Sequence, residues 1–394
     1  MKKLLLIGIN TRSMLNSALK LDYDVYSTSY FSTSDTPAVK NQKIILKENN
    51  GKSSGIFEDN FSSKSILESS KDYINEVDYI IPISGISPGD FKKKDLKKIL
   101  GNRNIENIKD KFRFYKKIKK EFLTPTTFHV TDIDEAHEIN KNQPDTQFIL
   151  KPIQGSGGYN INLLNNNDTI QFNDMEFIMQ EYISGINLST SVLSSKNEAN
   201  AIANSRLLTK NDYGNSNSFI YIGNIVPLTD KSIMADVKDI TRITNDMEET
   251  SENLMQKFNL IGSNGVDYIL NEKGLYVIEV NPRIQGTFEC IEKSFEINML
   301  EAHIRACEGE IIEIPEAKKY SYKKIIYSPT RMKYTPLDLN NIYDLPHKGT
   351  ITEKDEPLLT IIDSDEDFEK LYEKVESTSK TVDKLSRKNQ LNEE

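Results

Sequence analysis

The sequence predicts a protein that joins an α/β unit to α+β units. Three observations lead to this prediction. Strands and helices alternate along residues 1–100, a glycine-rich loop joins two apolar stretches near residue 155, and an apolar hairpin follows at residues 264–283. The length of 394 residues exceeds what one small core needs, so two or three domains are expected.

Composition and charge argue against several classes of function. The net charge of −9 argues against a nucleic-acid binder, whose affinity would depend on a basic surface. No apolar run approaches the ~20 residues that span a bilayer, so we expect no membrane partner and a cytoplasmic location. The 2 cysteines are too few for a disulfide scaffold or a zinc site.

Residues 1–100 are expected to form an open α/β unit. The apolar run LLLIGIN predicts a buried parallel strand, followed by a helix over 13–21, the strand DVYSTSYF, a helix near 65–75 and the strand VDYIIPIS. The loop after the first strand lacks GxGxxG, so binding of NAD or FAD is not expected. That loop still faces the usual ligand crevice, which makes Asn10 and Arg12 candidate substrate contacts. The alternative is a helix cap and a surface cation.

The next stretch contains the glycine loop. Residues 92–121 are predicted to be mostly helical up to the break at Pro125, and the strand TPTTFHV, a helix over 134–140 and the strand FILKP follow. Gln154-Gly155-Ser156-Gly157-Gly158 then leads into a strand over 159–164. No GK[ST] and no helix follow the glycines, so they indicate a hairpin lid and not a Walker loop. Their backbone N–H groups can approach phosphate oxygens.

Further strands are expected at 177–183, 188–193 and 201–207 and in FIYIGNIVPL, before a helix over about 232–258. After the hairpin we expect a helix at 297–307, a small β appendage over 313–363, a helix near 366–375 and a disordered polar tail at 377–394.

The hairpin carries the pattern that points to chemistry. Its strands, 266–270 and 275–280, flank a Glu272-Lys273-Gly274 turn, and Gly274 suits the left-handed position of a three-residue loop. That register places Asn271 opposite Leu275 and therefore Asp267 opposite Glu279. With a side-chain period of two, Asn281 shares the face of the acids, and Tyr268, Tyr276 and Ile278 point to the other face.

Two facing carboxylates repel each other and destabilise a strand pair. A cation between Asp267 and Glu279 would remove the repulsion. Carboxylate and amide oxygens are hard ligands, which favours Mg²⁺ or Mn²⁺ completed by water and substrate phosphates. The alternative is that both acids lie at solvated strand ends.

The order of these pieces resembles the ATP-grasp superfamily over roughly residues 1–312. The resemblance implies an ATP-grasp fold with a Rossmann-like N-terminal domain (1–100), a glycine-lid subdomain (101–183) and a C-terminal metal-binding domain (184–312), followed here by the β appendage (313–376) and the tail (377–394). DK before the Pro break resembles the first nucleotide lysine (Lys111), and FILKP resembles the strand of the second (Lys151). QGSGG resembles the phosphate lid, with Gly155, Ser156, Gly157 and Gly158. MQEYISG resembles the adenine strand, with Gln180, Glu181, Tyr182 and Ile183.

The stretch IEVNPR resembles the metal-binding motif, which implies Asp267, Glu279 and Asn281 as ligands and Arg283 at the reacting groups. One position departs from the pattern, because Asn187 stands where the family often has an acid for the ribose hydroxyls. FIYIGNIVPL and DLPHKG look most like archaeal ATP-grasp proteins such as tyramine–glutamate ligase.

The function implied by the resemblance is that of an ATP-dependent ligase using ATP and Mg²⁺ or Mn²⁺. A small-molecule carboxylate would attack the γ-phosphate to give an acyl phosphate, and an amine would then displace phosphate. Arg206 is a second catalytic candidate beside Arg283, with a surface salt bridge as its alternative. Substrate contacts are expected from Arg12, Tyr221, Asn224 and Gln285. A homodimer is possible by analogy.

Two other functions remain open from the sequence. Arg283-Ile284-Gln285 with Glu289 is similar to the bicarbonate-handling stretch of biotin-carboxylase-like members, although the spacing to the acid differs. A non-catalytic nucleotide-binding regulator is the third possibility, and the complete acid pair with Asn281 argues against it.

Overall fold

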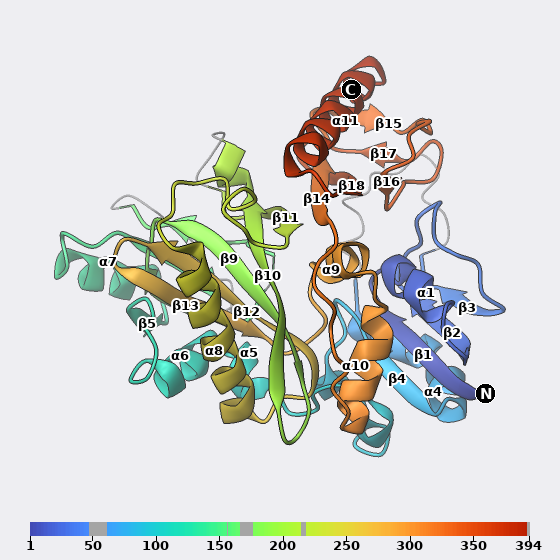
Figure 1. Cartoon of the computed structure of the whole chain (residues 1–394), viewed down its shortest axis with the longest axis horizontal. Coiled ribbons are helices and arrows are strands. Elements are labelled where there is room, and N and C mark those ends of the chain that lie inside the picture. The colour runs from blue at the N-terminus through green and yellow to red at the C-terminus, as the bar shows by residue number, and fades with distance from the viewer. Residues whose placement is uncertain (47–60, 156, 166–175, 214–217, 392–394) are drawn as a thin grey trace.

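The computed structural model describes residues 1–46, 61–155, 157–165, 176–213 and 218–391 (Figure 1). The N-terminal unit is built on a parallel sheet of β1 (Lys2–Gly8), β2 (Tyr23–Ser29), β3 (Asn41–Ile44) and β4 (Tyr79–Pro82), in the order β3-β2-β1-β4. The chain goes from β1 to β2 on one side, whereas β4 lies on the other. The carboxyl ends of β1 and β4 therefore border the switch point where open α/β sheets bind ligands.

The helices of this unit are α1 (Arg12–Ala18), α3 (Ser63–Ser69) and α4 (Lys71–Glu76). The single helix expected near 65–75 is thus two helices that meet at Ser70, and β3 was not expected. The alternation of strand and helix is as the sequence predicts, and β1 is buried along Leu4–Ile7 because both of its faces are covered.

The long helix expected over 92–121 is wrong. The structure has the 3₁₀ turns η1 (Pro88–Asp90) and η2 (Leu96–Lys98) and the short helices α5 (Glu106–Lys109) and α6 (Lys111–Ile118). The break between the two helices falls at Asp110, whose backbone is extended and whose side chain accepts a hydrogen bond from the N–H of Arg113. Asp110 is therefore an N-cap, and a cap starts a new helix at Lys111.

A second sheet follows, in the order β5-β8-β6-β7. It contains β5 (Thr127–Val130), β6 (Phe148–Pro152), β7 (Asn162–Leu163) and β8 (Phe177–Glu181), with α7 (Ile133–Lys141) packed against it. Ser156 and residues 166–175 lie outside the described residues. We call this unit the lid sheet, because Gln154 and Gly155, which begin the glycine-rich stretch, follow the end of β6.

The largest sheet has eight strands in the order β13-β12-β9-β10-β11-β14-β18-β16. Its first five in this order are β13 (Gly274–Asn281), β12 (Gly262–Asn271), β9 (Ile186–Ser194), β10 (Ala199–Thr209) and β11 (Tyr221–Val226). The helix α8 (Ile240–Phe258) packs on one face of β9, β10 and β12, and it begins later than the expected residue 232. The 3₁₀ turn η3 (Lys210–Tyr213) follows β10. The helices α9 (Phe288–Phe295) and α10 (Met299–Glu308) lie toward the N-terminal unit (Figure 1).

The C-terminal strands extend this same sheet. Strands β14 (Tyr320–Tyr327), β18 (Pro357–Asp365) and β16 (Ile342–Tyr343) continue it beyond β11, whereas β15 (Met332–Lys333) and β17 (Ile351–Thr352) form a separate pair. Residues 377–388, expected to be disordered, belong to the helix α11 (Phe368–Lys388). Leu371, Val375 and Val382 are fully buried against β14 and β18, which explains why the helix is ordered over this length. No helix in the described part of the chain has both the length and the apolar character needed to cross a bilayer.

In the hairpin of β12 and β13, the predicted pairing of the two acids is confirmed, but the predicted register at the turn is wrong. Asp267 lies opposite Glu279 as predicted, but Asn271 pairs with Gly274 and not with Leu275. A β-bulge restores the pairing of the acids, because the register shifts between Asp267 and Tyr268 and leaves Ile278 as the additional residue.

The bulge also changes which residues share a face. Tyr268 packs in the core under α8 together with Leu275 and Val277, and not with Tyr276 and Ile278 as strict alternation predicts. Ile278 instead lines a cleft beside Glu279. Gly274 has a φ of +139°, so the expectation of a positive φ there is confirmed, but the loop itself is only Glu272-Lys273.

Candidate functional site

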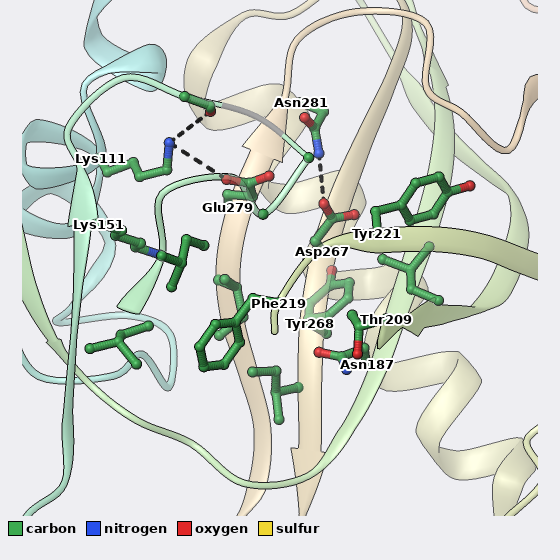
Figure 2. A pocket seen from close by; sticks show the side chains of 18 of the residues that line it. Lys111, Lys151, Asn187, Thr209, Phe219, Tyr221, Asp267, Tyr268, Glu279 and Asn281 are labelled. Atoms are coloured by element: carbon green, nitrogen blue, oxygen red, sulfur yellow. Dashed lines mark hydrogen bonds and ion pairs between the residues drawn. The ribbon is translucent and has the colours of Figure 1, made fainter. Parts of the chain in front are cut away.

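A cleft of about 440 Å³ lies between the lid sheet and the eight-stranded sheet (Figure 2). The structure brings most of the predicted site residues to this one cleft. Its lining includes Lys111, Lys151, Gly155, Gly157, Gly158, Gln180, Glu181, Tyr182, Ile183, Asn187, Tyr221, Asp267, Glu279, Asn281, Arg283 and Gln285.

The two facing acids form the floor of the cleft on β12 and β13. Asp267 accepts hydrogen bonds from the Ser189 hydroxyl (2.7 Å) and from Asn281 Nδ2 (2.8 Å). Glu279 lies 3.9 Å from Lys111 Nζ. Burial, and then the nearby charge of Glu279, raises the pKa of Asp267 well above its usual value.

Two lysines face these acids from the lid side. Lys111, the first residue of α6, donates to the carbonyl oxygen of Gly155 (3.0 Å) and lies across from Glu279. Lys151 lies on β6 and is only 4% exposed. Burial and the like charge of Lys111 lower the pKa of Lys151 to about 8. Among the described residues no carboxylate lies within ion-pair distance of Lys151, so a bound anion is what would compensate its charge.

The loop between β13 and α9 carries Arg283 and Gln285. Arg283 is exposed and donates to the Asn281 side chain (3.3 Å) and to the carbonyl of Ile284 (3.2 Å). Gln285 Nε2 donates to Ser189 (3.2 Å) and Asp267 (3.3 Å). This side chain lies directly over Gly265, where an added Cβ would come within 1.7 Å of the Gln285 amide carbon. Gly265 thus makes room for the side chain that contacts Asp267.

The far end of the cleft is formed by β8 and the residues after it. Gln180 is buried and donates to Thr127 (2.8 Å), and Glu181 accepts from the N–H of Thr126 (3.0 Å). Both side chains are engaged in the protein, so a ligand here would meet the backbone of 181–183. Asn187 lines this region from β9, near Thr209 (Figure 2).

The glycine loop packs against the strand β11. The N–H of Tyr221 donates to the carbonyl of Gly157 (3.1 Å). Gly158 has a φ of +78°, and an added Cβ there would lie 2.0 Å from the carbonyl oxygen of Phe219. A side chain at position 158 would therefore push the loop away from this edge of the cleft.

Three predicted residues are not available to a ligand in the cleft. Arg206 is buried, and its guanidinium bonds to Asp212 and to the carbonyls of Asn187 and Leu207 (both 2.8 Å). Arg12 is 2% exposed and binds Glu289 with two nitrogens (2.5 and 3.3 Å). Asn224 is fully buried and accepts from the Tyr221 hydroxyl (2.5 Å). The structure places all three behind the cleft wall.

Sequence reasoning missed a row of small polar side chains on β9. Ser189 contacts Asp267, and Ser191 contacts Gln285 (3.1 Å) and Thr287 (3.0 Å). Asn187, Ser189 and Ser191 alternate along the strand and so share one face. The sequence did contain a signal for this polar face, because polar residues alternate in INLSTSVL. A strand in the core of this sheet would otherwise carry apolar residues at these positions.

The residues present fit a divalent cation of the magnesium type. In the parts of the chain that the structure describes, no three His, Cys, Asp or Glu residues cluster as metal ligands. Two carboxylates and the amide oxygen of Asn281 are what the chain offers. Such an incomplete set of oxygen donors suits Mg²⁺ or Mn²⁺, which retain waters and take further oxygens from phosphates. The mutual repulsion of Asp267 and Glu279 would be relieved by that charge.

Comparisons with known proteins agree with this arrangement. Residues 108–287 match the family described as an ATP-grasp domain. The chain is 29% identical over 367 residues to an uncharacterised protein of Methanocaldococcus jannaschii, covering 91% of this chain and 88% of that protein. It is 28% identical over 193 residues to the tyramine–L-glutamate ligase of the same organism, covering 49% of this chain and 52% of that protein.

A solved structure is similar over nearly its whole length. N5-carboxyaminoimidazole ribonucleotide synthetase from Thermotoga maritima superposes with a TM-score of 0.69 at 17% identity, covering 96% of this chain and 98% of that one. At this identity the likeness shows the fold alone, and it confirms the ATP-grasp fold that the sequence predicts.

Proposed function

We propose that the chain, whose residues 108–287 match the ATP-grasp domain family, is an ATP-dependent ligase that couples a small-molecule carboxylate to an amine. The observation that carries this proposal is the meeting of two lysines, two facing acids and Arg283 in one cleft. Point charges on lysine suit phosphate oxygens, and a planar guanidinium suits a carboxylate. The similarity to a tyramine–L-glutamate ligase supports amide formation as the reaction class.

Each group in the cleft has a role in this proposal. Lys111 and Lys151 bind phosphate oxygens of ATP, and the backbone of Gly155, Gly157 and Gly158 covers them. Asp267, Glu279 and Asn281 would hold Mg²⁺ or Mn²⁺, which when bound neutralises charge that develops on the phosphates. The backbone of 181–183 contacts the adenine, and Asn187 contacts the ribose, since an amide can hydrogen-bond hydroxyl groups.

The reaction proceeds in two steps in the same cleft. A carboxylate oxygen of the acid, held by Arg283, forms a bond to the γ-phosphorus of ATP while the bond to the β-bridging oxygen breaks, so that ADP leaves. The amine nitrogen then forms a bond to the acyl carbon, phosphate departs, and the nitrogen loses a proton. The lid residues exclude water, because an acyl phosphate exposed to solvent would hydrolyse.

The structure favours this proposal over bicarbonate activation. Glu289 would be the acid that handles bicarbonate, but Arg12 binds it bidentately and Lys323 Nζ lies 3.0 Å from it. Burial alone would raise the pKa of Glu289, but the charges of Lys323 and Arg12 hold it below its usual value. A carboxylate with a lowered pKa that is paired with two cations behind the cleft wall is a poor proton acceptor for a substrate.

The proposal is tested by ADP release against panels of carboxylates and amines. Release that requires one acid and one amine together supports the ligase, and release that depends on bicarbonate supports the alternative. ATP binding without turnover under any pairing would identify a regulator instead.

The acid pair provides the matching variant test. The double variant Asp267→Asn with Glu279→Gln should lower the rate of ADP release at least about 10²-fold, because charge on the phosphates is no longer neutralised. Its thermal midpoint without nucleotide should be equal to or above that of the wild type, since the two carboxylates no longer repel each other. Retained activity in a folded variant would remove this pair as the metal site.

A further inference from the structure

A second cleft of about 510 Å³ adjoins the first one. The two clefts share Ser84, Lys111, Gly155, Glu279, Asn281 and Arg283. The second cleft extends from these residues to the loop 83–87, which follows β4. This is the switch point of the N-terminal sheet, where an open parallel sheet is expected to bind a ligand. A molecule placed here would have one end at Arg283 and the acid pair.

The charged side chains that line the second cleft differ in whether a group of opposite charge lies beside them. Asp90 keeps its negative charge, and its oxygens accept hydrogen bonds from the N–H of Ser87 (2.7 Å) and the Ser63 hydroxyl (3.3 Å). Glu279 faces Lys111 at 3.9 Å. His303 is neutral near pH 7, since burial lowers its pKa to about 4. The other charged side chains of the lining are Lys109 and Arg283, so that with Lys111 its three cations outnumber its two carboxylates.

Neither of these two cations has an ion-pair partner in the ranges that the structure describes. Lys109, at the end of α5, donates to the Ser87 hydroxyl (3.2 Å) and is partly buried. Arg283 contacts only neutral oxygen atoms of Asn281 and Ile284. The wall of the same cleft also presents Ile86, Ile105, Ile108 and Phe114. The cleft thus offers two cations and an apolar wall.

We propose that the carboxylate substrate is a small dianion, bound through its reacting carboxylate at Arg283 and through a second anionic group at Lys109 and Ser87. This inference rests on the proposed ligase function and specifies the acid that this function takes. The second group is a carboxylate or a phosphate, which an ammonium and a hydroxyl bind equally well. The apolar wall suits a short carbon chain between the two groups.

The test compares dianions with matched monoanions. Succinate, glutarate, aspartate and glutamate would be assayed against their ω-monoamides, and 3-phosphoglycerate represents the phosphorylated carboxylates. ADP release in the presence of an amine panel and calorimetric binding to protein loaded with Mg²⁺ and a non-hydrolysable ATP analogue are both measured. We expect at least one dianion to bind 10-fold or more tightly than its monoamide.

Variants at position 109 test whether Lys109 causes the preference for the dianion. Lys109→Gln should raise KM for the dianion at least 10-fold, with kcat and the KM for ATP unchanged, and should leave the monoamide unaffected. Lys109→Arg should retain most of the preference, and Lys93→Gln, at an exposed lysine outside the cleft, is the matched control. Equal binding of diacid and monoamide, or an equal loss of both in Lys109→Gln, would overturn the inference while leaving the ligase proposal intact. A protein that binds the dianion but never releases ADP would overturn the ligase proposal and retain the anion site.

Discussion

Lys151 illustrates how a single residue can be costly for folding and useful for binding. It lies at the end of β6 where every position of the strand is buried, and its ammonium lacks a carboxylate partner among the described residues. A buried, unpaired charge destabilises a folded protein unless something compensates it. The phosphates of a bound nucleotide would supply that compensation.

Replacing Lys151 by methionine should therefore have opposite effects with and without nucleotide. The variant should be as stable as the wild type or more stable in the absence of nucleotide, because no buried charge remains. Its affinity for ATP should fall about 10- to 100-fold, the equivalent of one hydrogen bond to a charged group. Thermal midpoints with and without Mg-ATP measure both effects.

The pH dependence gives a further check on the same residue. The pKa of Lys151 lies near 8 in the folded protein and near 10.5 when unfolded. The unfolded chain binds more protons between these values, so the stability of the wild type rises with pH over that window. The advantage of Lys151→Met should shrink as pH rises from 8 toward 10. An advantage that is constant with pH would show that the lysine is not buried in its charged form.

Gly265 and Gln285 form a second pair that is tested at the level of residues. A Cβ at position 265 would overlap the Gln285 amide, so Gly265→Ala should destabilise the protein by about 1–3 kcal/mol through overpacking. The same change in a Gln285→Ala background should cost under ~0.5 kcal/mol, because the overlapping atoms are gone. Denaturant unfolding of the four proteins completes the cycle, and equal costs in both backgrounds would mean that this contact is not the source of the loss.

At the scale of elements, local motifs were predictable and long-range partners were not. Lys111, Lys151 and the acid pair reach the cleft as expected because each depends on a short stretch whose strand or cap is encoded locally. The register of the hairpin was wrong at the turn, since a bulge adds a residue that alternation cannot locate. Arg206 and Arg12 do not line the cleft, for a different reason. Their partners, Asp212 and Glu289, become neighbours only through η3 and α9, which the sequence did not predict.

The C-terminal tail was also predicted wrongly, because its order depends on packing against a sheet. Residues 377–388 are polar enough to suggest disorder, yet Val382 and Ser386 are buried in α11. A few apolar positions spaced along a helix suffice when a sheet is already present to receive them. The strands that receive this helix are β18, which ends at Asp365 just before α11, and β14, which ends about 40 residues earlier at Tyr327.

The packing of α10 on β12 depends on one buried histidine. His303 Nδ1 accepts the N–H of Ser263 (2.9 Å), and its Nε2 lies 3.3 Å from the carbonyl of Leu100. These contacts assign the neutral tautomer with the proton on Nε2. A proton on Nδ1 would remove the first hydrogen bond and bury a charge.

Acid should therefore destabilise the protein through this residue. The pKa of His303 falls from 6.5 to about 4 on folding, so between these values the unfolded chain binds more protons and stability decreases as pH falls. The difference in unfolding free energy between wild type and His303→Gln should shrink by up to about 1.4 kcal/mol per pH unit from pH 6.5 downward. Denaturant unfolding at pH 7, 6 and 5 measures it, with His347→Gln, at an exposed site, as the matched control. Parallel curves for wild type and His303→Gln would contradict the assignment.

At the scale of the whole molecule, one buried ion network joins three distant parts of the chain. Arg12 comes from the N-terminal unit, Glu289 from α9, and Asp344 from the segment after β16. Arg12 Nε lies 2.9 Å from Asp344, and Lys323 of β14 lies 3.0 Å from Glu289. Lys323 Nζ also donates to the carbonyl oxygen of Gly286 (3.4 Å), in the segment that carries Arg283 and Gln285. The network therefore fixes the N-terminal unit against the sheet that bears the acid pair.

Removing Arg12 should reveal whether the residue supports the structure or contacts a substrate. Arg12→Met leaves Glu289 and Asp344 with Lys323 as their remaining close cation, so the unfolding free energy should fall by about 3–5 kcal/mol. In a Glu289→Leu background the same change should cost less, because one of the stranded charges is gone. A coupling energy above about 0.5 kcal/mol between the two positions is expected for residues in contact.

The exposed pair of Arg242 and Asp246 serves as the control, since Arg242→Met should cost under about 1 kcal/mol. An Arg12→Met protein with wild-type stability and a raised KM for the acid would instead restore Arg12 as a substrate contact. A destabilised protein with additive costs in the cycle would show that Arg12 acts through Asp344 or Asp35, which both lie within ion-pair distance of its Nε, and not through Glu289. The predicted outcome, loss of stability with strong coupling to Glu289, places Arg12 in the junction of the three parts.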